Sequence, residues 1–237
     1  MVIFPFTISG FYLIIVVMAE SVYTTENYNL TCATECIKNK KPFEYVLSGP
    51  SQKSREFIKN VALEYLRTIG KEKFYNLLCL CIEEVISNSV KANIKRAYFL
   101  SNNLDISNPS DYEKGMKNFK EAGMGKVKDP NLVKKVNSLG LYVKMIFKLQ
   151  DNTFYITTHN NSVISKEELE RINKKLSLSQ NQTPEQMFLT SIDTTEGAGL
   201  GIIMIKKILS QISSAPDCFS IRATNTETIT ELKITRD

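Results

Sequence analysis

Residues 73–92, with the sequence KFYNLLCLCIEEVISNSVKA, carry the strongest fold signal in the chain. Their apolar residues recur every three or four positions, which is the spacing of a helix that buries one face. These residues are Phe74, Leu77, Leu78, Cys81, Ile82, Val85 and Ile86. Glu84, Asn88 and Lys91 follow one another at helical spacing and form a narrow polar stripe beside the apolar arc. The pattern predicts a helix whose polar stripe lies at the edge of the core, where it can face a pocket.

Shorter patterns on both sides of this helix predict the rest of the fold. Alternation predicts a strand at 43–47, and helical spacing predicts a helix at 54–69 that ends at Gly70. The later elements are expected to be a hairpin of strands 141–149 and 153–158, helices 167–176 and 200–212, and strands 219–222 and 228–234. This arrangement predicts an α+β fold, a two-layer sandwich of helices on a mixed, mainly antiparallel sheet.

Composition places these elements in one domain, at 20–237. The chain has 237 residues, 43% of them hydrophobic and 23% charged, which is ordinary for a globular domain. The net charge of +5 is mild and the basic residues are scattered, so nucleic acid is not expected as a partner. Residues 101–139 are rich in Asn, Asp, Lys and Gly and are expected to be an insertion, with a short helix at 112–121.

Two other features limit the functional classes. The five cysteines are odd in number and irregularly spaced, which argues against a disulfide framework and against a four-ligand zinc site. Residues 1–19 carry no charge and are barely long enough to span a membrane. This segment is interpreted as a membrane anchor, a signal, or upstream sequence with Met18 as the true start. A membrane is expected as a partner only if the segment is a genuine anchor.

The residue types on the polar stripe suit Mg²⁺ and phosphate chemistry. Mg²⁺ prefers oxygen ligands such as the amide oxygen of Asn88 and often bridges phosphates with few protein ligands. A carboxylate one turn earlier, Glu84, can orient or deprotonate a water or a hydroxyl. Lys91 can neutralise phosphate. By itself, such a stripe is more often a solvated helix face.

A glycine-rich segment precedes the expected helix at 200–212. Residues 196–202 read EGAGLGI, in which Gly197, Gly199 and Gly201 permit close backbone approach. The N-terminal amides of the following helix attract anions. Taken alone, a run of this kind is often a turn with close packing.

Together, and in this order, three segments resemble the nucleotide-binding motifs of the GHKL superfamily, which comprises gyrase, chaperone, histidine-kinase and MutL ATPases. Glu84, Asn88 and Lys91 resemble its N box. Residues 196–201 resemble its second glycine box and are the most specific match. Residues 160–162, with the sequence NNS, fall where the family usually has Asp-x-Gly.

The resemblance covers residues 43–234 and implies the histidine-kinase-like ATPase fold, with nucleotide between the helical layer and the sheet. It implies that Glu84 is the general base, that Asn88 is the Mg²⁺ ligand, and that the segment at about 165–197 is an ATP lid. The residues that it assigns to ATP are Asn88, Lys91, Asn160, Gly197, Gly199, Leu200, Gly201 and Thr228.

Two positions depart from the family pattern. Asn160 replaces an aspartate that accepts a hydrogen bond from the adenine amino group. A neutral acceptor contributes about 1 kcal/mol less than a charged one, or roughly a tenfold loss in affinity. Asn160 can still accept from the amino group and donate to a ring nitrogen. Ser162 replaces a glycine and is expected to crowd the base.

The layout resembles the stand-alone kinase-like domains of anti-sigma regulators, which bind ATP, phosphorylate a serine on a partner and bind a sigma factor. No histidine lies on an upstream dimerisation helix, and His159 is the only histidine, so self-phosphorylation is not expected. The resemblance therefore implies a cytoplasmic ATP-binding regulatory domain that uses ATP and Mg²⁺ and acts on a protein partner in trans, as a protein serine kinase. The alternative is a non-catalytic interaction module with a degenerate nucleotide site. A mechanochemical ATPase would need further domains and is not favoured.

Overall fold

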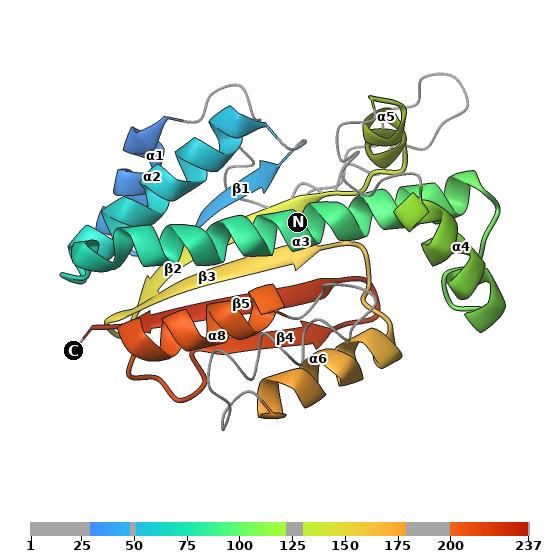
Figure 1. The fold of residues 1–237 in the computed structure, drawn as a ribbon. Coiled ribbons are helices and arrows are strands. Elements are labelled where there is room, and N and C mark those ends of the chain that lie inside the picture. The colour runs from blue at the N-terminus through green and yellow to red at the C-terminus, as the bar shows by residue number, and fades with distance from the viewer. Residues whose placement is uncertain (1–28, 48–50, 122–129, 179–199, 237) are drawn as a thin grey trace, which may run out of the picture.

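The computed structural model describes residues 29–47, 51–121, 130–178 and 200–236. In these residues, helices cover one face of a five-stranded sheet, which confirms the α+β two-layer sandwich expected from the sequence (Figure 1). The helices are α1 (Leu30–Lys38), α2 (Gln52–Thr68), the 3-10 helix η1 (Glu72–Phe74), α3 (Tyr75–Ser101), α4 (Pro109–Glu121), α5 (Pro130–Ser138), α6 (Lys166–Leu178) and α8 (Leu200–Ile212). The strands are β1 (Phe43–Leu47), β2 (Val143–Gln150), β3 (Thr153–Asn160), β4 (Phe219–Ala223) and β5 (Thr228–Thr235).

The strands lie in the order β1-β2-β3-β5-β4, which makes β3 the central strand. Every pairing among the described strands is antiparallel, although the sequence had allowed a mixed sheet. Asn160, the last residue of β3, pairs with Val143 on β2 and Thr228 on β5. The end of the central strand therefore brings Asn160 and Thr228 side by side.

A tight turn joins β2 and β3, as the sequence predicted. Gln150 pairs with Thr153, so two residues form the turn. Both of them, Asp151 and Asn152, have positive φ (49° and 60°), which matches the twist of a two-residue hairpin. This turn sets the register that places Asn160 at the opposite end of β3.

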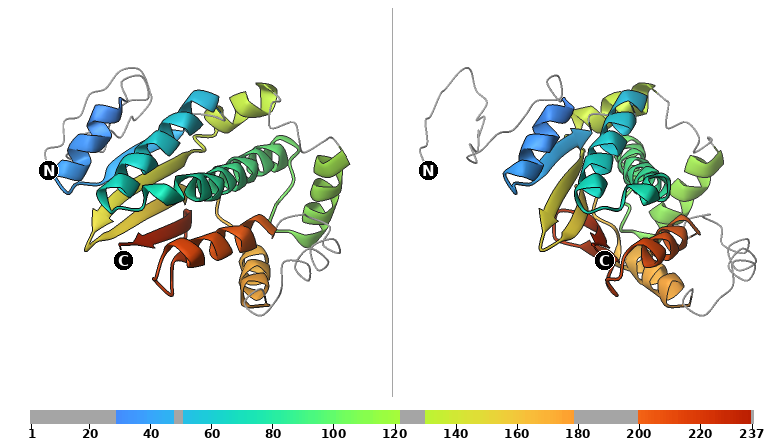
Figure 2. Two further views of the ribbon diagram at one scale, coloured as in Figure 1. Left: turned by 60° about the vertical axis from the view of Figure 1, so that its left-hand side comes forward. Right: turned by 90° about the vertical axis from the view of Figure 1, so that its left-hand side faces the viewer.

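Alternate side chains of the strands face the helices and form the core. Tyr65 of α2 stacks on Phe154 of β3 with ring centroids 4.7 Å apart, and its hydroxyl donates to the Phe147 carbonyl at 3.1 Å. Figure 2 shows α2, α3 and α8 on the same side of the sheet. In the described residues, the polar side chains that face these helices at the end of β3 therefore lie between the two layers.

Helix α3 extends well beyond the predicted range of 73–92. Its 27 residues end at Ser101, because Ile94 and Ala97 remain buried and Phe99 is buried against α4. The extension carries α4 and α5, the helices of the 101–139 insertion (Figure 1). The sequence analysis missed α5, although Pro130 at its first position is a favoured helix start.

Helix α8 has the predicted bounds and runs back along α3. The Lys71 ammonium, just before α3, lies 3.5 Å from the carbonyl oxygen of Ile212, the last residue of α8. At the other end of α8, Gly201 contacts the middle of α3 at Glu84. The antiparallel contact of these two helices forms one end of the candidate site.

All five cysteines are free thiols. Cys81 is buried, as predicted, and burial raises the pKa of its thiol to about 12. Cys79, two residues earlier on α3, is only half-buried. Within the described residues, no helix has the length and apolar character needed to cross a bilayer. The uncharged segment 1–19 lies outside the described residues.

Candidate functional site

Glu84 and Asn88 form a hydrogen-bonded pair on α3. The Asn88 amide nitrogen donates to Glu84 Oε1 at 2.9 Å, one helical turn away, and both residues are half-buried. A carboxylate only accepts hydrogen bonds, so this contact assigns the amide nitrogen of Asn88 to Glu84. The amide oxygen of Asn88 is left available as a hard ligand for a cation.

Gly201 of α8 lies directly against the Glu84 side chain. A Cβ atom at this position would overlap the Glu84 carboxylate and lie 2.8 Å from Cγ. Only glycine permits this approach with Glu84 in its present position. The predicted N box and the helix that follows the predicted glycine box therefore meet in space, although they are far apart in the sequence.

The other predicted residues of this end are only partly located. Leu200 is the first described residue of α8 and is exposed. Lys91 is exposed on α3, and no described residue forms an ion pair with it. Gly197 and Gly199, together with most of the expected lid at 165–197, lie outside the described residues.

Asn160 is built into the scaffold at the end of β3. It is 3% exposed, and its amide nitrogen donates to the Ser89 carbonyl of α3 at 2.9 Å. Its Oδ1 accepts from the backbone N–H of Ser162, also at 2.9 Å. An aspartate would place a second acceptor against the Ser89 carbonyl, which explains why an amide fits this position. One N–H and one lone pair of Asn160 remain uncommitted.

Thr228 fixes the chain that leaves β3. Its hydroxyl donates to the Ser162 carbonyl at 2.8 Å and accepts from the Ile164 N–H at 2.7 Å. The residue predicted to lie near a base therefore shapes residues 162–164, which connect β3 with α6. Asn160 and Thr228 lie side by side on paired strands, and both bind backbone groups.

Three buried polar atoms around this region have no hydrogen-bond partner in the part of the chain that the structure describes. They are Asn93 Oδ1, Thr158 Oγ1 and Ser162 Oγ. Thr158 and Ser162 are only 1% and 7% exposed and flank Asn160. Unpaired buried polar groups are costly, so a polar ligand or water would stabilise this arrangement. The sequence analysis missed Asn93 and Thr158, although Thr158 precedes Asn160 by one strand period and therefore shares its face.

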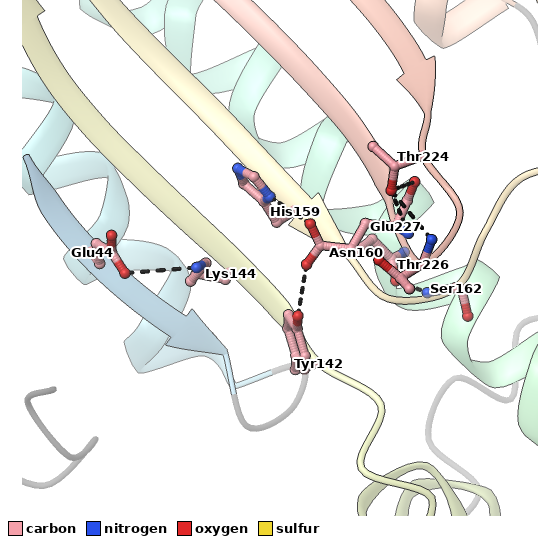
Figure 3. A network of polar contacts seen from close by, with 9 residues as sticks. All are labelled: Glu44, Tyr142, Lys144, His159, Asn160, Ser162, Thr224, Thr226 and Glu227. Carbon is pink, nitrogen blue, oxygen red and sulfur yellow. Dashed lines mark hydrogen bonds and ion pairs between the residues drawn. The ribbon is translucent and has the colours of Figure 1, made fainter. Parts of the chain in front are cut away.

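His159 lies on the opposite face of the sheet from Asn160, because successive strand residues alternate. Its Nδ1 is 2.9 Å from Glu227 Oε2, while the Tyr142 hydroxyl donates to Glu227 Oε1 at 2.6 Å (Figure 3). The hydrogen bond with His159, and after it the hydrogen bond with Tyr142, hold the pKa of Glu227 below its usual range. The Glu227 contact and burial raise the pKa of Tyr142 to about 12. His159 therefore belongs to a network outside the candidate site.

Comparison with known proteins gives a similarity in sequence and a similarity in structure, but no family match. No protein-family model matches the chain. The chain is 30% identical over 182 residues to an uncharacterized protein of Treponema pallidum (strain Nichols), a match that covers 76% of this chain and 35% of that protein. The chain thus spans about a third of the length of this relative. A chain of the SiaB–SiaC complex from Pseudomonas aeruginosa aligns with a TM-score of 0.40 and 14% identity, covering 88% of this chain and 99% of that chain.

Proposed function

We propose that this chain is an ATP-binding regulatory domain of the histidine-kinase-like type that transfers phosphate to a serine of a protein partner. The contact of Gly201 with the hydrogen-bonded pair Glu84 and Asn88 supports this function most directly. It unites the two motifs that resemble the N box and the glycine box. The proposed ATP position lies between α3 and α8, with the base toward the end of β3.

The chemistry of Asn88 fits Mg²⁺. Its amide nitrogen is bound to Glu84, so its oxygen is the atom offered to a cation. Mg²⁺ accepts a single protein oxygen when phosphates and waters complete its octahedron. When bound, the ion would neutralise the charge of the phosphates. Lys91, exposed on the same stripe, would contact phosphate, as would the backbone of Gly197, Gly199, Leu200 and Gly201.

Glu84 is suited to accept the proton of an attacking hydroxyl. It lies beside the first turn of α8, where backbone N–H groups favour an anion such as phosphate. The only histidine of the chain, His159, faces away from this position. An acceptor on a separate protein is therefore favoured over a histidine of the same domain.

We call the end of the site at Asn160 and Thr228, where the adenine base would lie, the base end. It supports a second candidate function, a non-catalytic interaction module that retains the fold. Asn160 uses one N–H and one lone pair on Ser89 and Ser162, and Thr228 is bound to backbone on both sides. These contacts leave fewer groups to recognise an adenine base. Nucleotide binding separates the two functions.

The test is calorimetric titration of ATP and ADP into the full chain, with and without Mg²⁺, followed by an assay of ATP turnover. Asn88→Ala should weaken Mg²⁺-dependent binding by about ten- to a hundredfold, since contacts to charged groups are strong. Glu84→Gln should retain binding and lower turnover by about two to four orders of magnitude.

Two variants of α3 are matched controls for these changes. Asn76→Ala alters an exposed asparagine on the same helix. Glu83→Gln alters the neighbouring glutamate, which pairs instead with Arg55 and Lys59. Failure of the chain to bind either nucleotide at millimolar concentration would favour the interaction module. Unchanged turnover in Glu84→Gln would remove the catalytic assignment.

A further inference from the structure

The 101–139 insertion is firmly packed on the helix that carries the candidate site. Gly115 of α4 lies so close to Phe99 of α3 that an added Cβ would be 2.5 Å from the ring. Phe119 of α4 packs on Tyr98 of α3, with ring centroids 5.1 Å apart. Helix α4 is therefore a fixed part of the helical layer.

Residues from three helices meet at the carboxylate of Glu168, on α6. Lys95 of α3 forms an ion pair with Glu168 Oε1, and the two side chains are 17% and 18% exposed. The Tyr112 hydroxyl of α4 donates to the same oxygen at 3.2 Å, and the Lys95 ammonium lies 5.8 Å from the centre of the Tyr112 ring. We call Lys95, Tyr112 and Glu168 the Glu168 junction.

Glu168 also holds the first turn of α6. The Ser165 hydroxyl accepts from the Glu168 N–H at 3.1 Å, and Glu168 Oε2 lies 3.4 Å from the Ser165 nitrogen. This reciprocal pattern is a capping box, which fixes where a helix begins. One carboxylate therefore sets the start of α6 and joins it to α3 and α4.

Both ends of the candidate site contact the segment that this junction holds. Residues 162–164, which Thr228 binds, run directly into Ser165 and link α6 with Asn160. Helix α6 also packs against α8, which brings Gly201 to Glu84. A continuous series of contacts thus leads from α4 to the base end and to α8.

We propose that Tyr112 and Glu168 are positioning residues of the nucleotide site, so that the insertion sets nucleotide affinity through α6. This inference rests on the proposed function. Loss of the Tyr112 hydroxyl or of the Glu168 charge frees the start of α6 and increases the motion of residues 162–165. The nucleotide must then restore this order on binding, so its affinity falls.

The test is calorimetric titration of ATP and Mg²⁺ into the full chain and its variants, at a temperature well below thermal unfolding. Tyr112→Phe and Glu168→Gln are each expected to weaken binding about fivefold or more. The double variant should bind no more weakly than Glu168→Gln alone, because both changes break the same contact. A purely structural role would lower the thermal midpoint and leave the affinity unchanged, and that result would overturn the proposal.

Two controls use the same substitutions at nearby positions. Tyr98→Phe alters the same α3–α4 interface at a hydroxyl without a hydrogen-bond partner among the described residues. Glu170→Gln alters an α6 glutamate whose ion pair with Lys166 is 68% and 85% exposed. Both controls should bind as the parent chain does. If the parent chain binds and all variants bind equally, this inference fails alone; if the parent chain binds no nucleotide, the proposed function fails with it.

Discussion

The two ends of the candidate site differ in what their polar side chains bind. Between α3 and α8, the side chains of Glu84 and Asn88 hydrogen-bond only to each other among the described residues, and both are half-buried. At the end of β3, Asn160 and Thr228 bind backbone groups of two segments, α3 and the connection at 162–164. The first end keeps its groups available for a ligand, whereas the second uses them to hold the two layers together. Substitutions should therefore affect function at one end and stability at the other.

The largest difference is expected from the same substitution at the two ends. Asn160→Ala should lower the free energy of unfolding by about 2–3 kcal/mol, because the Ser89 carbonyl and Ser162 N–H lose buried partners. Asn88→Ala should lower it by less than about 0.5 kcal/mol, since its amide is half-buried. Urea unfolding of both variants measures the difference. Equal losses would abolish the distinction between the two ends.

A smaller effect is expected where α8 contacts α3. In Gly201→Ala, the new methyl group displaces the Glu84 carboxylate and breaks its contact with Asn88, at a net cost of up to about 1 kcal/mol in stability, because the Glu84 side chain can move and alanine favours the helix. Thermal unfolding should show that most of this loss disappears in a Glu84→Ala background, where the obstructing carboxylate is absent. A loss of the same size in both backgrounds would show that strain elsewhere in α8 is responsible.

Thr228 allows the role of a single hydroxyl at the base end to be measured. Thr228→Val retains the shape of the side chain but removes both hydrogen bonds, which should lower the free energy of unfolding by about 1 kcal/mol. Thr228→Ser keeps the hydroxyl and should stay close to the parent chain. Urea midpoints compare the three proteins, and a serine variant as unstable as the valine variant would assign the effect to methyl packing instead.

The smallest effect concerns pH. Burial of Glu168 by itself would raise the pKa of its carboxyl. The Lys95 ammonium and hydrogen bonds to the carboxylate outweigh this effect and keep the pKa below its usual range. A depressed pKa stabilises the fold above the unfolded value of about 4.3, and this contribution is lost as the pH falls through the folded pKa. The parent chain should exceed Glu168→Gln in stability by about 0.5–1 kcal/mol at pH 7.

This difference should begin to shrink as the pH falls below about 4.3 and should disappear only below the folded pKa, where the carboxyl is neutral in both folded and unfolded chains. Urea unfolding at several pH values checks the trend. A difference that stays constant as the pH is lowered from about 4.3 through the folded pKa would mean that the shape of the glutamine, rather than the lost charge, causes the effect. Glu170→Gln on the exposed face of α6 provides the baseline for such a series.

Local patterns in the sequence predicted most of the elements well. The bounds of β1 and α8 agree with the prediction, because strand alternation and helical spacing are read from adjacent residues. Helix α3 was predicted too short, because its last turns lie beyond the sheet and pack on α4 instead. Helix α5 has amphipathic spacing but only nine residues, and the Asn-, Asp-, Lys- and Gly-rich composition of 101–139 predicted an insertion there instead.

The candidate site was predictable only in part. The sequence identified Glu84 and Asn88 because both lie one turn apart on a strongly periodic helix. It did not reveal the backbone contacts of Asn160, since Ser89 belongs to a distant segment. Nor did it reveal Glu168, a glutamate among several near the start of α6, whose partners come from α3 and α4.

By itself, then, the sequence determined where most of the helices and strands lie and which polar residues share a helix face, because both follow from the 3.6-residue and two-residue repeats of the backbone. Only the tertiary structure decided that Gly201 contacts Glu84, that Asn160 binds α3, and that the insertion reaches α6 through Tyr112. Those contacts join segments far apart in the chain. Which residues meet in these contacts depends on how the helical layer packs on the sheet, and this cannot be read from the spacing of neighbouring residues.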